Sequence, residues 1–161
     1  MKNKKCSKCN KIKDLSDFYA YRADCKNCNR KRKSQYLSTE IGFMNSLYYR
    51  INHSQFNEKK GRQNKCYISR EHFFNLWKKH KTLYGMKCYY LGIDINFEKH
   101  SNGQRLNQVS VDRIDSEKDY VLDNIVFCSA LANHIKGHCN LTVAKKMIKL
   151  SKEKPYEKSD R

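Results

Sequence analysis

Four cysteines in the first 28 residues are spaced as two metal-binding knuckles. The stretch CSKCNKIKDLSDFYAYRADCKNC carries Cys6, Cys9, Cys25 and Cys28, a C-x2-C-x15-C-x2-C arrangement. Two such pairs can present four thiolates tetrahedrally to zinc, and in a short segment the metal supplies folding energy outright. Because four thiolates leave no open coordination position, the spacing predicts one structural zinc ion per chain and no catalysis there. Free or disulfide-bonded thiols are the alternative.

A second group of functional residue types surrounds a predicted reversal of the chain. Residues 110–124 read SVDRIDSEKDYVLDN, whereas a strand built only to fill a core would alternate apolar and polar residues and then end. Each residue alone has an ordinary explanation as a turn former, a strand end or a packed aromatic. Their conjunction predicts a functional site. The residues are Asp112, Arg113, Asp115, Tyr120, Asp123 and Asn124.

The charge of the chain points to an anionic partner. Over 161 residues, 34 Lys and Arg face 16 Asp and Glu, for a net charge of +18. An excess of positive charge destabilises the compact state by self-repulsion unless a bound anion neutralises it. The phosphate backbone of a nucleic acid is the usual anion. No segment approaches the roughly 20 apolar residues of a membrane-spanning helix. Nucleic acid, and not a membrane, is therefore the predicted partner.

Two basic clusters are the predicted phosphate contacts. The first follows the last knuckle directly, and the second lies in the predicted loop NEKKGRQNK. Any one of these residues would equally suit a solvated surface. The clusters are Arg30, Lys31, Arg32 and Lys33, and Lys59, Lys60 and Arg62.

Cysteine usage indicates a reducing compartment. The start MKNKKCSKC has no apolar run after its lysines, so a secretory signal is not expected. The eight cysteines are then expected inside the cell, in the cytoplasm, where metal binding is favoured over disulfides.

The elements that must position these residues predict a small α+β chain in four parts. Residues 1–33 form a cysteine module with a basic tail, and residues 34–85 form a helical linker and DNA-contact region. Residues 86–152 form a strand-rich core with a C-terminal helix that begins at Thr142, and residues 153–161 form a charged tail.

Helical periodicity is clearest in two segments. Residues 34 to about 60 are predicted helical, and Ser69 is predicted to cap a second helix. The apolar stripe of the first is Ile41, Met44, Leu47, Tyr48 and Ile51, and that of the second is Phe73, Leu76, Trp77 and His80.

Strands and a short helix follow. KCYYLGIDINF (87–97), LNQVSVDRI (106–114) and IVFC (125–128) are predicted strands, with a turn at SNGQ. SALANHIKG is predicted to be a helix that is capped by Ser129 and ends at Gly137.

The strand, reversal, strand and helix of residues 109–137 resemble the ββα-metal unit of HNH endonucleases. The matching pieces are VDRID, DYVLDNIV and ANHIKG. The resemblance extends to a branch that carries Arg beside the metal-binding Asp and includes rare-cutting restriction enzymes. It takes in the N-terminal knuckles and the KCYYLGI segment. It implies a metal-dependent endonuclease that hydrolyses phosphodiester bonds in double-stranded DNA, with residues 86–152 as the nuclease core.

Carried over by resemblance, Asp112 is a carboxylate ligand for Mg²⁺ or a similar divalent cation, and Asn133 is the second protein ligand. Such hard cations prefer oxygen ligands and usually take only one or two from protein. Asn124 would brace the reversal by bonding backbone groups, and Lys136 would neutralise a phosphate.

Arg113 stands where most HNH enzymes have the histidine that activates water. Arginine stays protonated, so it cannot act as a general base, but it can clamp a phosphate with two hydrogen bonds. Tyr120 is the predicted base, helped by Arg113 and the metal because its ordinary pKa is near 10. His134 is the alternative base.

The chain departs from the family at its second zinc site. The first knuckle reads CYYL, which keeps Cys88 but not its partner, and Ser129 and Ala132 replace the other pair. We expect packing to replace that metal, with Cys88 and Cys128 buried as small hydrophobes. The alternative is a rearranged zinc site that uses these two thiols and one of His134, His138 or Cys139.

The leading interpretation is a metal-dependent DNA endonuclease with a structural zinc. A catalytically inactive zinc-containing nucleic-acid-binding protein on the same fold is the rival, motivated by Arg113 and the lost knuckle. A protein-binding scaffold fits the charge poorly. Since one site cuts one strand, double-strand cleavage would require a homodimer or sequential nicking.

Overall fold

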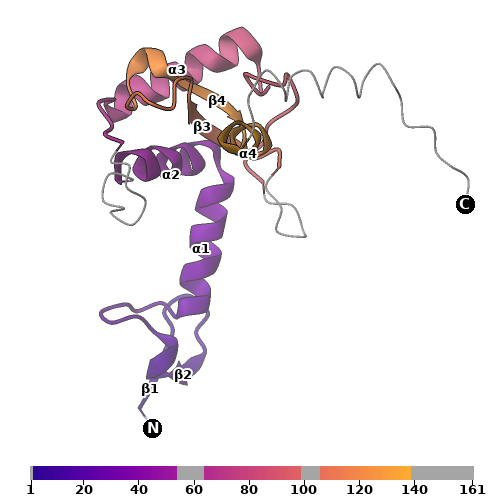
Figure 1. Cartoon of the computed structure of the whole chain (residues 1–161). Coiled ribbons are helices and arrows are strands. Elements are labelled where there is room, and N and C mark those ends of the chain that lie inside the picture. Colours follow the sequence, from indigo (N-terminus) through magenta and orange to yellow (C-terminus); the bar gives the residue numbers. More distant parts are fainter. Residues whose placement is uncertain (1, 54–63, 99–105, 139–161) are drawn as a thin grey trace, which may run out of the picture. The chain divides into compact units, whose positions relative to one another are not determined.

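The chain divides into two compact units, Met1–Ser46 and Leu47–Arg161, which are drawn in Figure 1. The computed structural model describes residues 2–53, 64–98 and 106–138. Several predicted features lie outside these residues: the helix from Thr142, the turn SNGQ, the second basic cluster (Lys59, Lys60, Arg62) and Cys139. The four-part division is finer than these two units and stays a prediction.

The first unit begins with a small hairpin. Strands β1 (Asn3–Lys5) and β2 (Ile12–Asp14) are antiparallel, and the knuckle turn between them closes with the Asn10 N–H donating to the Cys6 carbonyl at 2.9 Å. Asn10 has φ 56°, a left-handed conformation that asparagine tolerates better than most residues. Asp14 caps the 3₁₀ turn η1 (Leu15–Asp17). Phe18 packs with the buried Cys6 and Cys25 as the core of this hairpin.

Helix α1 (Lys26–Ser38) starts directly after Cys25, earlier than the predicted residue 34. It ends at Thr39, whose extended backbone separates it from α2 (Glu40–His53). The Thr39 hydroxyl accepts a hydrogen bond from the N–H of Gly42 at 3.1 Å. Glycine is required at this corner, because a Cβ on Gly42 would lie 1.9 Å from the carbonyl oxygen of Tyr36.

The predicted apolar stripe of α2 is correct at Met44, Leu47 and Ile51, which are buried. It is wrong at Ile41, which is 63% exposed, while Phe43 is buried instead. The buried face of the helix runs through Phe43, Met44, Leu47 and Ile51, and Ile41, beside the Thr39 corner, lies off this face.

The second unit packs a helix against a two-stranded sheet. As predicted, Ser69 caps α3 (Arg70–Tyr84), its hydroxyl accepting from the N–H of His72 at 3.1 Å. β3 (Val109–Arg113) and β4 (Ile125–Ser129) are antiparallel, with Asp112 opposite Val126. The ring of Phe127 on β4 meets three rings of α3 at centroid distances of 5.0–5.6 Å. These rings are Phe73, Trp77 and His80.

The 3₁₀ turn η4 (Leu122–Asn124) leads into β4, and α4 (Ala130–His138) begins directly after β4 ends. The hydroxyl of Ser129 accepts from the N–H of Ala132 at 3.1 Å, which confirms the predicted cap. α4 is described as far as His138, one residue beyond the predicted end at Gly137.

The predicted strand 87–97 is wrong. Residues 86–95 form a turn with one isolated bridge, Lys87 to Asp94, and Gly92 takes φ 65° in it. This left-handed position breaks the extended conformation that the apolar pattern favoured. A second isolated bridge joins Asn96 to Gln108, beside β3.

The small α+β class is confirmed, with helices and two short antiparallel sheets in the described residues. None of the helices described is both long and apolar enough to cross a membrane.

Candidate functional site

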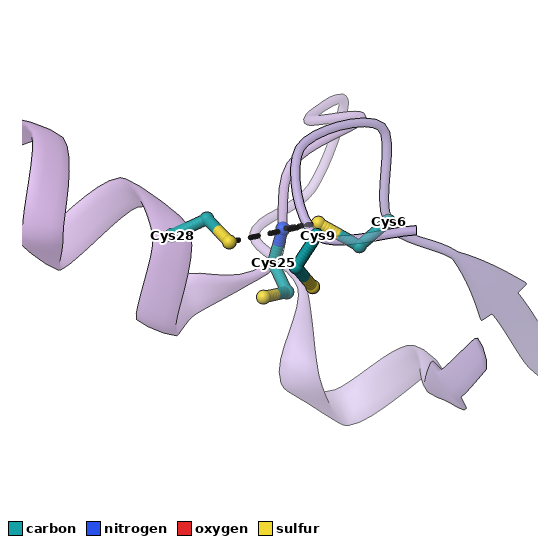
Figure 2. A group of neighbouring side chains, drawn as sticks. All are labelled: Cys6, Cys9, Cys25 and Cys28. Atoms are coloured by element: carbon teal, nitrogen blue, oxygen red, sulfur yellow. Dashed lines mark hydrogen bonds between the residues drawn. The ribbon is translucent and has the colours of Figure 1, made fainter. Parts of the chain in front are cut away.

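The four knuckle cysteines converge as predicted. Their sulfur atoms all lie within 4.8 Å of one another (Figure 2). The sulfurs of Cys6 and Cys28 are 3.9 Å apart, close to the roughly 3.8 Å edge of a tetrahedron with metal–sulfur bonds of about 2.3 Å. The group could therefore hold a tetrahedral metal ion.

Backbone donors prepare this cluster for thiolates. The N–H groups of Cys9 and Cys25 point at the sulfur of Cys6 and lower its pKa to about 6; the Cys25 nitrogen lies 3.2 Å away. Burial and the neighbouring sulfurs raise the pKa of Cys28 to about 12. Four thiolates this close repel one another, so a cation is the natural way to hold all of them ionised.

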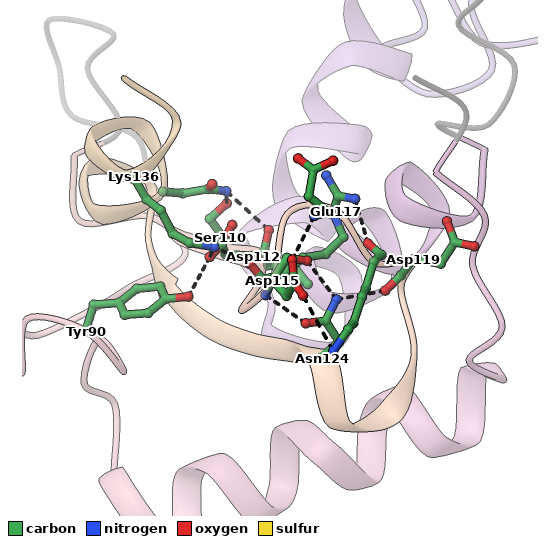
Figure 3. A network of polar contacts seen from close by, with 12 residues as sticks. Tyr90, Ser110, Asp112, Asp115, Glu117, Asp119, Asn124 and Lys136 are labelled. Atoms are coloured by element: carbon green, nitrogen blue, oxygen red, sulfur yellow. Dashed lines mark hydrogen bonds and ion pairs between the residues drawn. The ribbon is translucent and has the colours of Figure 1, made fainter. Parts of the chain in front are cut away.

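The reversal between β3 and β4 is held by Asn124. Its amide oxygen accepts from the N–H of Asp115 at 2.8 Å, and its amide nitrogen donates to the carbonyls of Asp115 and Asp119, both at 3.0 Å (Figure 3). Asn124 is only 4% exposed. These contacts fasten the two sides of the reversal together, which is the bracing role that the resemblance implies.

Asp112, near the end of β3, accepts two side-chain hydrogen bonds on one carboxylate oxygen. Its Oδ2 accepts from Tyr90 Oη at 2.6 Å and from Lys136 Nζ at 2.7 Å (Figure 3). Lys136 also donates to the backbone carbonyl of Arg113. Burial and the hydrogen bond to Asp112 raise the pKa of Tyr90, so this phenol remains a donor. Among the described residues, no hydrogen bond reaches Oδ1.

Asn133 on α4 is turned toward β3. Its amide nitrogen donates to the hydroxyl of Ser110 at 2.9 Å and to the carbonyl of Val111 at 3.2 Å. Both amide hydrogens are therefore used within the ββα unit. The amide oxygen is the atom of this side chain that remains for a cation.

Arg113 is held by one end of its guanidinium. Nη1 donates to Oδ1 of Asn64 at 2.6 Å and to the carbonyl of Lys118 at 2.7 Å. The guanidinium carbon lies 5.2 Å from the centre of the Tyr120 ring. The Tyr120 phenol also lies within hydrogen-bonding reach of this guanidinium. The guanidinium lines the cavity, where it can take a phosphate.

Tyr120 is fixed by a strand-like pairing with residues 64–67. Its backbone N–H donates to the carbonyl of Lys65 and its carbonyl accepts from the N–H of Tyr67, both at 3.0 Å. Burial raises the pKa of Tyr120, and the Arg113 guanidinium opposes this shift without cancelling it. The phenol is therefore protonated at neutral pH in the structure as it stands.

One cavity of about 370 Å³ collects most of the predicted catalytic residues. Five of them line it, whereas Asn124 does not, and neither does Asp115, whose carboxylate instead accepts from the N–H of Glu117. His134 is exposed on α4 and is not among the lining residues. The lining residues are Val111, Asp112, Arg113, Ser116, Tyr120, Asn133, Lys136 and Gly137.

The first basic cluster lies exposed along α1. Arg32 forms an ion pair with the buried Asp24 at 3.5 Å, while its own side chain stays 52% exposed. The cluster is therefore accessible to a polyanion, and its role in binding one stays a prediction.

At the position of the missing second zinc site, Cys88 and Cys128 are buried, 2% and 0% exposed. The sulfur of Cys88 accepts from the N–H of Ser129 at 3.2 Å, and burial raises the pKa of Cys128. Within residues 2–53, 64–98 and 106–138, the N-terminal cysteines form the one cluster with metal-site geometry. Cys88 and Cys128 are therefore buried as expected, whereas Cys139, a candidate ligand of the alternative zinc site, lies outside the described residues.

Three residues at the site were not singled out by sequence reasoning. Tyr90 lies in the altered CYYL knuckle, Asn64 lies near the end of the predicted loop NEKKGRQNK, and Ser116 lies in the reversal. Motif spacing carries no signal for the first two, because each reaches the site through a long-range contact. The replacement of a knuckle position by tyrosine is the one hint that the sequence offers.

No family model and no curated protein matches the chain. Among solved structures, it is similar to the rare-cutting HNH restriction endonuclease PacI, with a TM-score of 0.37 and 22% identity over 93% of this chain and 92% of that one. A likeness at this level does not assign an activity to the chain.

Proposed function

We propose that the protein is a metal-dependent endonuclease that hydrolyses phosphodiester bonds in double-stranded DNA. The observation that carries this proposal is the cavity in the ββα unit, where a carboxylate, an amide oxygen, an anchored guanidinium, a phenol and an ammonium converge. This set combines cation ligands, phosphate-binding groups and a proton-exchanging group around one volume.

The donor set suits a hard divalent cation. Asp112 and Asn133 would hold Mg²⁺ or a similar ion through Oδ1 of the carboxylate and the amide oxygen, the two oxygens without partners among the described residues. The ion, when bound, polarises the scissile phosphate and stabilises charge on the leaving oxygen.

Arg113 binds the substrate phosphate in this proposal. Since Nη1 is already engaged by Asn64 and Lys118, the guanidinium is oriented before the substrate arrives. Lys136 supplies a second positive charge at the same cavity. Both charges favour the additional negative charge that develops on the phosphate during hydrolysis.

Tyr120 is the residue that we propose to take the proton from the attacking water. Its phenol must first lose its own proton to solvent water, and the neighbouring Arg113 favours the phenolate. His134 remains the alternative base. Its exposed place outside the cavity lining supports it less than the cavity supports Tyr120.

The N-terminal cysteine group would hold a structural zinc ion, and the exposed cluster on α1 would contact DNA phosphates. Arginine and lysine side chains bind phosphates with a strong dependence on monovalent salt. These contacts increase affinity for DNA without adding chemistry.

The rival function is binding of nucleic acid without cleavage. One observation favours it: Oδ2 of Asp112 is already paired with a buried ammonium, an arrangement that needs no cation to be stable. Binding of this kind would depend on monovalent salt and persist in EDTA.

Plasmid cleavage by the full chain distinguishes the two. The full chain is incubated with supercoiled plasmid and with a random-sequence duplex library, in Mg²⁺ or in EDTA. The library is included so that a strict recognition sequence is not missed. We expect Mg²⁺-dependent cleavage that is lost in Asp112→Ala and kept in Asp123→Ala, which removes an exposed acid of the same reversal. Tight DNA binding without cleavage of either substrate would establish the binding protein. The ratio of nicked to linear plasmid reports whether one site acts alone or two sites act together. Two sites acting together, as in a homodimer, would give linear product.

A further inference from the structure

We propose that Tyr90 is a positioning residue for Asp112, which holds the carboxylate so that Oδ1 is presented to the cavity. The inference rests on the proposed function, because it assigns to Asp112 the binding of a divalent cation. It begins from the shortest side-chain contact that Asp112 makes, the 2.6 Å hydrogen bond from Tyr90 Oη to Oδ2.

Tyr90 and Lys136 together fix the rotation of the carboxylate. Both donate to the same oxygen, Oδ2, at 2.6 and 2.7 Å. The Lys136 ammonium also lies 5.7 Å from the centre of the Tyr90 ring, so the two donors support one another. Hydrogen bonds to an ionised carboxylate are short and strong. With Oδ2 anchored at two points, Oδ1 is the atom left to coordinate a cation.

The turn that carries Tyr90 is closed on itself. Within residues 86–95, Cys88 N–H donates to the carbonyl of Ile93 and Gly92 N–H to that of Cys88, both at 2.8 Å. Ile95 N–H donates to the carbonyl of Met86 at 2.9 Å. These bonds give the turn a defined shape without a metal ion.

The same turn is fastened to β4. Tyr89 N–H donates to the carbonyl of Phe127 at 3.1 Å, and Ser129 N–H donates to the sulfur of Cys88 at 3.2 Å. Since β4 pairs with β3 at the level of Asp112, the turn and the carboxylate are fixed to the same two-stranded sheet. The phenol of Tyr90 therefore reaches Asp112 from a rigid support.

Tyr89, the neighbour of Tyr90 in this turn, does not contact Asp112 through its hydroxyl. Tyr89 is 40% exposed, and its ring meets the rings of Tyr84 and Tyr90 edge-on. Its hydroxyl has no hydrogen bond to any described residue. Tyr89→Phe is therefore a matched control for Tyr90→Phe, because each variant removes one hydroxyl from the same turn.

The test measures binding of the metal alone. The zinc-loaded full chain is titrated with Mn²⁺ in a calorimeter, and DNA affinity is measured separately in EDTA. We expect Tyr90→Phe to bind Mn²⁺ about 10- to 100-fold more weakly, the usual effect of removing a group that orients a metal ligand. DNA affinity in EDTA should stay unchanged. Tyr89→Phe should match the wild type in both.

A second measurement separates positioning from packing. In the Asp112→Asn background the ionised carboxylate is gone, so Tyr90→Phe should lower Tm much less than it does in the wild-type background. An equal loss of Tm in both backgrounds, or Mn²⁺ binding by Tyr90→Phe as tight as that of Tyr89→Phe, overturns the inference.

Failure of the inference and failure of the proposed function remain distinguishable. A wild-type protein that cleaves DNA, with Tyr90→Phe unimpaired in Mn²⁺ binding, overturns the role of Tyr90 alone. Mn²⁺ binding that depends on Tyr90 in a protein that cuts neither DNA substrate supports the positioning role and overturns the nuclease.

Discussion

Nζ of Lys136 lies 2.7 Å from Oδ2 of Asp112, and the two side chains are only 12% and 11% exposed. Two opposite charges with so little access to water depend on each other. Removing one leaves the other charge nearly buried and uncompensated, which costs far more than the loss of a surface ion pair. The pair therefore contributes to the folding of the ββα unit.

Lys136→Met should lower the free energy of unfolding by about 3 kcal/mol, since it keeps the aliphatic stem and removes only the charge. Lys118→Met is the control, because the pair of Lys118 with Asp115 is 69% and 44% exposed and should contribute less than about 1 kcal/mol. Urea unfolding of zinc-loaded protein measures both. Equal losses in the two variants would contradict the interdependence of Lys136 and Asp112.

Local signals in the sequence predicted the parts of this site that depend on local structure. Ser69 and the helical stripe that follows it predicted α3 and its cap. The apolar run at 125–128 and Ser129 predicted β4 and the start of α4. Cysteine spacing alone predicted the convergence of four sulfurs.

What the sequence did not reveal depends on contacts between distant residues. Asn64 and Arg113 are 49 positions apart, and Tyr90 and Asp112 are 22 apart. The pattern at 87–97 favoured a strand because apolar residues dominate it, but Gly92 turns the chain there and places Tyr90 on the carboxylate. No periodicity or motif encodes such a meeting, since it arises from tertiary packing.

Asn124→Ala should destabilise the protein by about 2 to 3 kcal/mol, because it leaves buried backbone groups of the reversal without partners. Asn124→Asp should be no better, since it keeps the acceptor for the N–H of Asp115 but sets a carboxylate oxygen against two carbonyls. Asp123→Ala, at the exposed neighbouring position, should change stability by less than about 0.5 kcal/mol. Urea unfolding again provides the comparison, and a stable Asn124→Ala would remove the bracing role.

Cys9→Ser should abolish stoichiometric zinc binding, because the cluster needs all four sulfurs to close a tetrahedral site. Zinc released on thiol modification, measured with a chromogenic chelator, should fall from about one ion per chain to a small fraction of that. Cys66→Ser, which removes a half-buried thiol outside the cluster, should retain the full content. Loss of zinc in Cys66→Ser with retention in Cys9→Ser would place the metal elsewhere.

His80 should make the protein less stable as the pH falls. Burial lowers the pKa of His80, and its Nε2 meets the carbonyl of Lys87 at 2.9 Å, so the folded protein holds a neutral ring that donates from Nε2. In the unfolded chain the pKa is about 6.5. As the pH drops through that value, the unfolded chain takes up a proton that the folded protein does not, and the free energy of unfolding decreases.

The His80→Gln variant retains an N–H donor for the Lys87 carbonyl and does not titrate. Its free energy of unfolding, measured in urea from about pH 7.5 to about pH 5.5, should therefore fall less steeply than that of the wild type. His72→Gln, at an exposed position of the same helix, should keep the wild-type slope. If His72→Gln flattens the slope and His80→Gln does not, burial of His80 is not the cause of the pH dependence.

Arg113→Lys tests whether the cavity needs a guanidinium or only a positive charge. Lysine keeps the charge but cannot bind Asn64 and Lys118 through one nitrogen while presenting a second edge to a phosphate. We expect cleavage to slow by about 100-fold, with DNA affinity in EDTA changed little. Asn64→Ala, which keeps the arginine and removes one anchor, should slow cleavage by about 10-fold because the guanidinium loses part of its orientation. A lysine variant that cleaves at the wild-type rate would show that charge alone is sufficient, and the contact between Asn64 and Arg113 would then serve the fold and not the reaction.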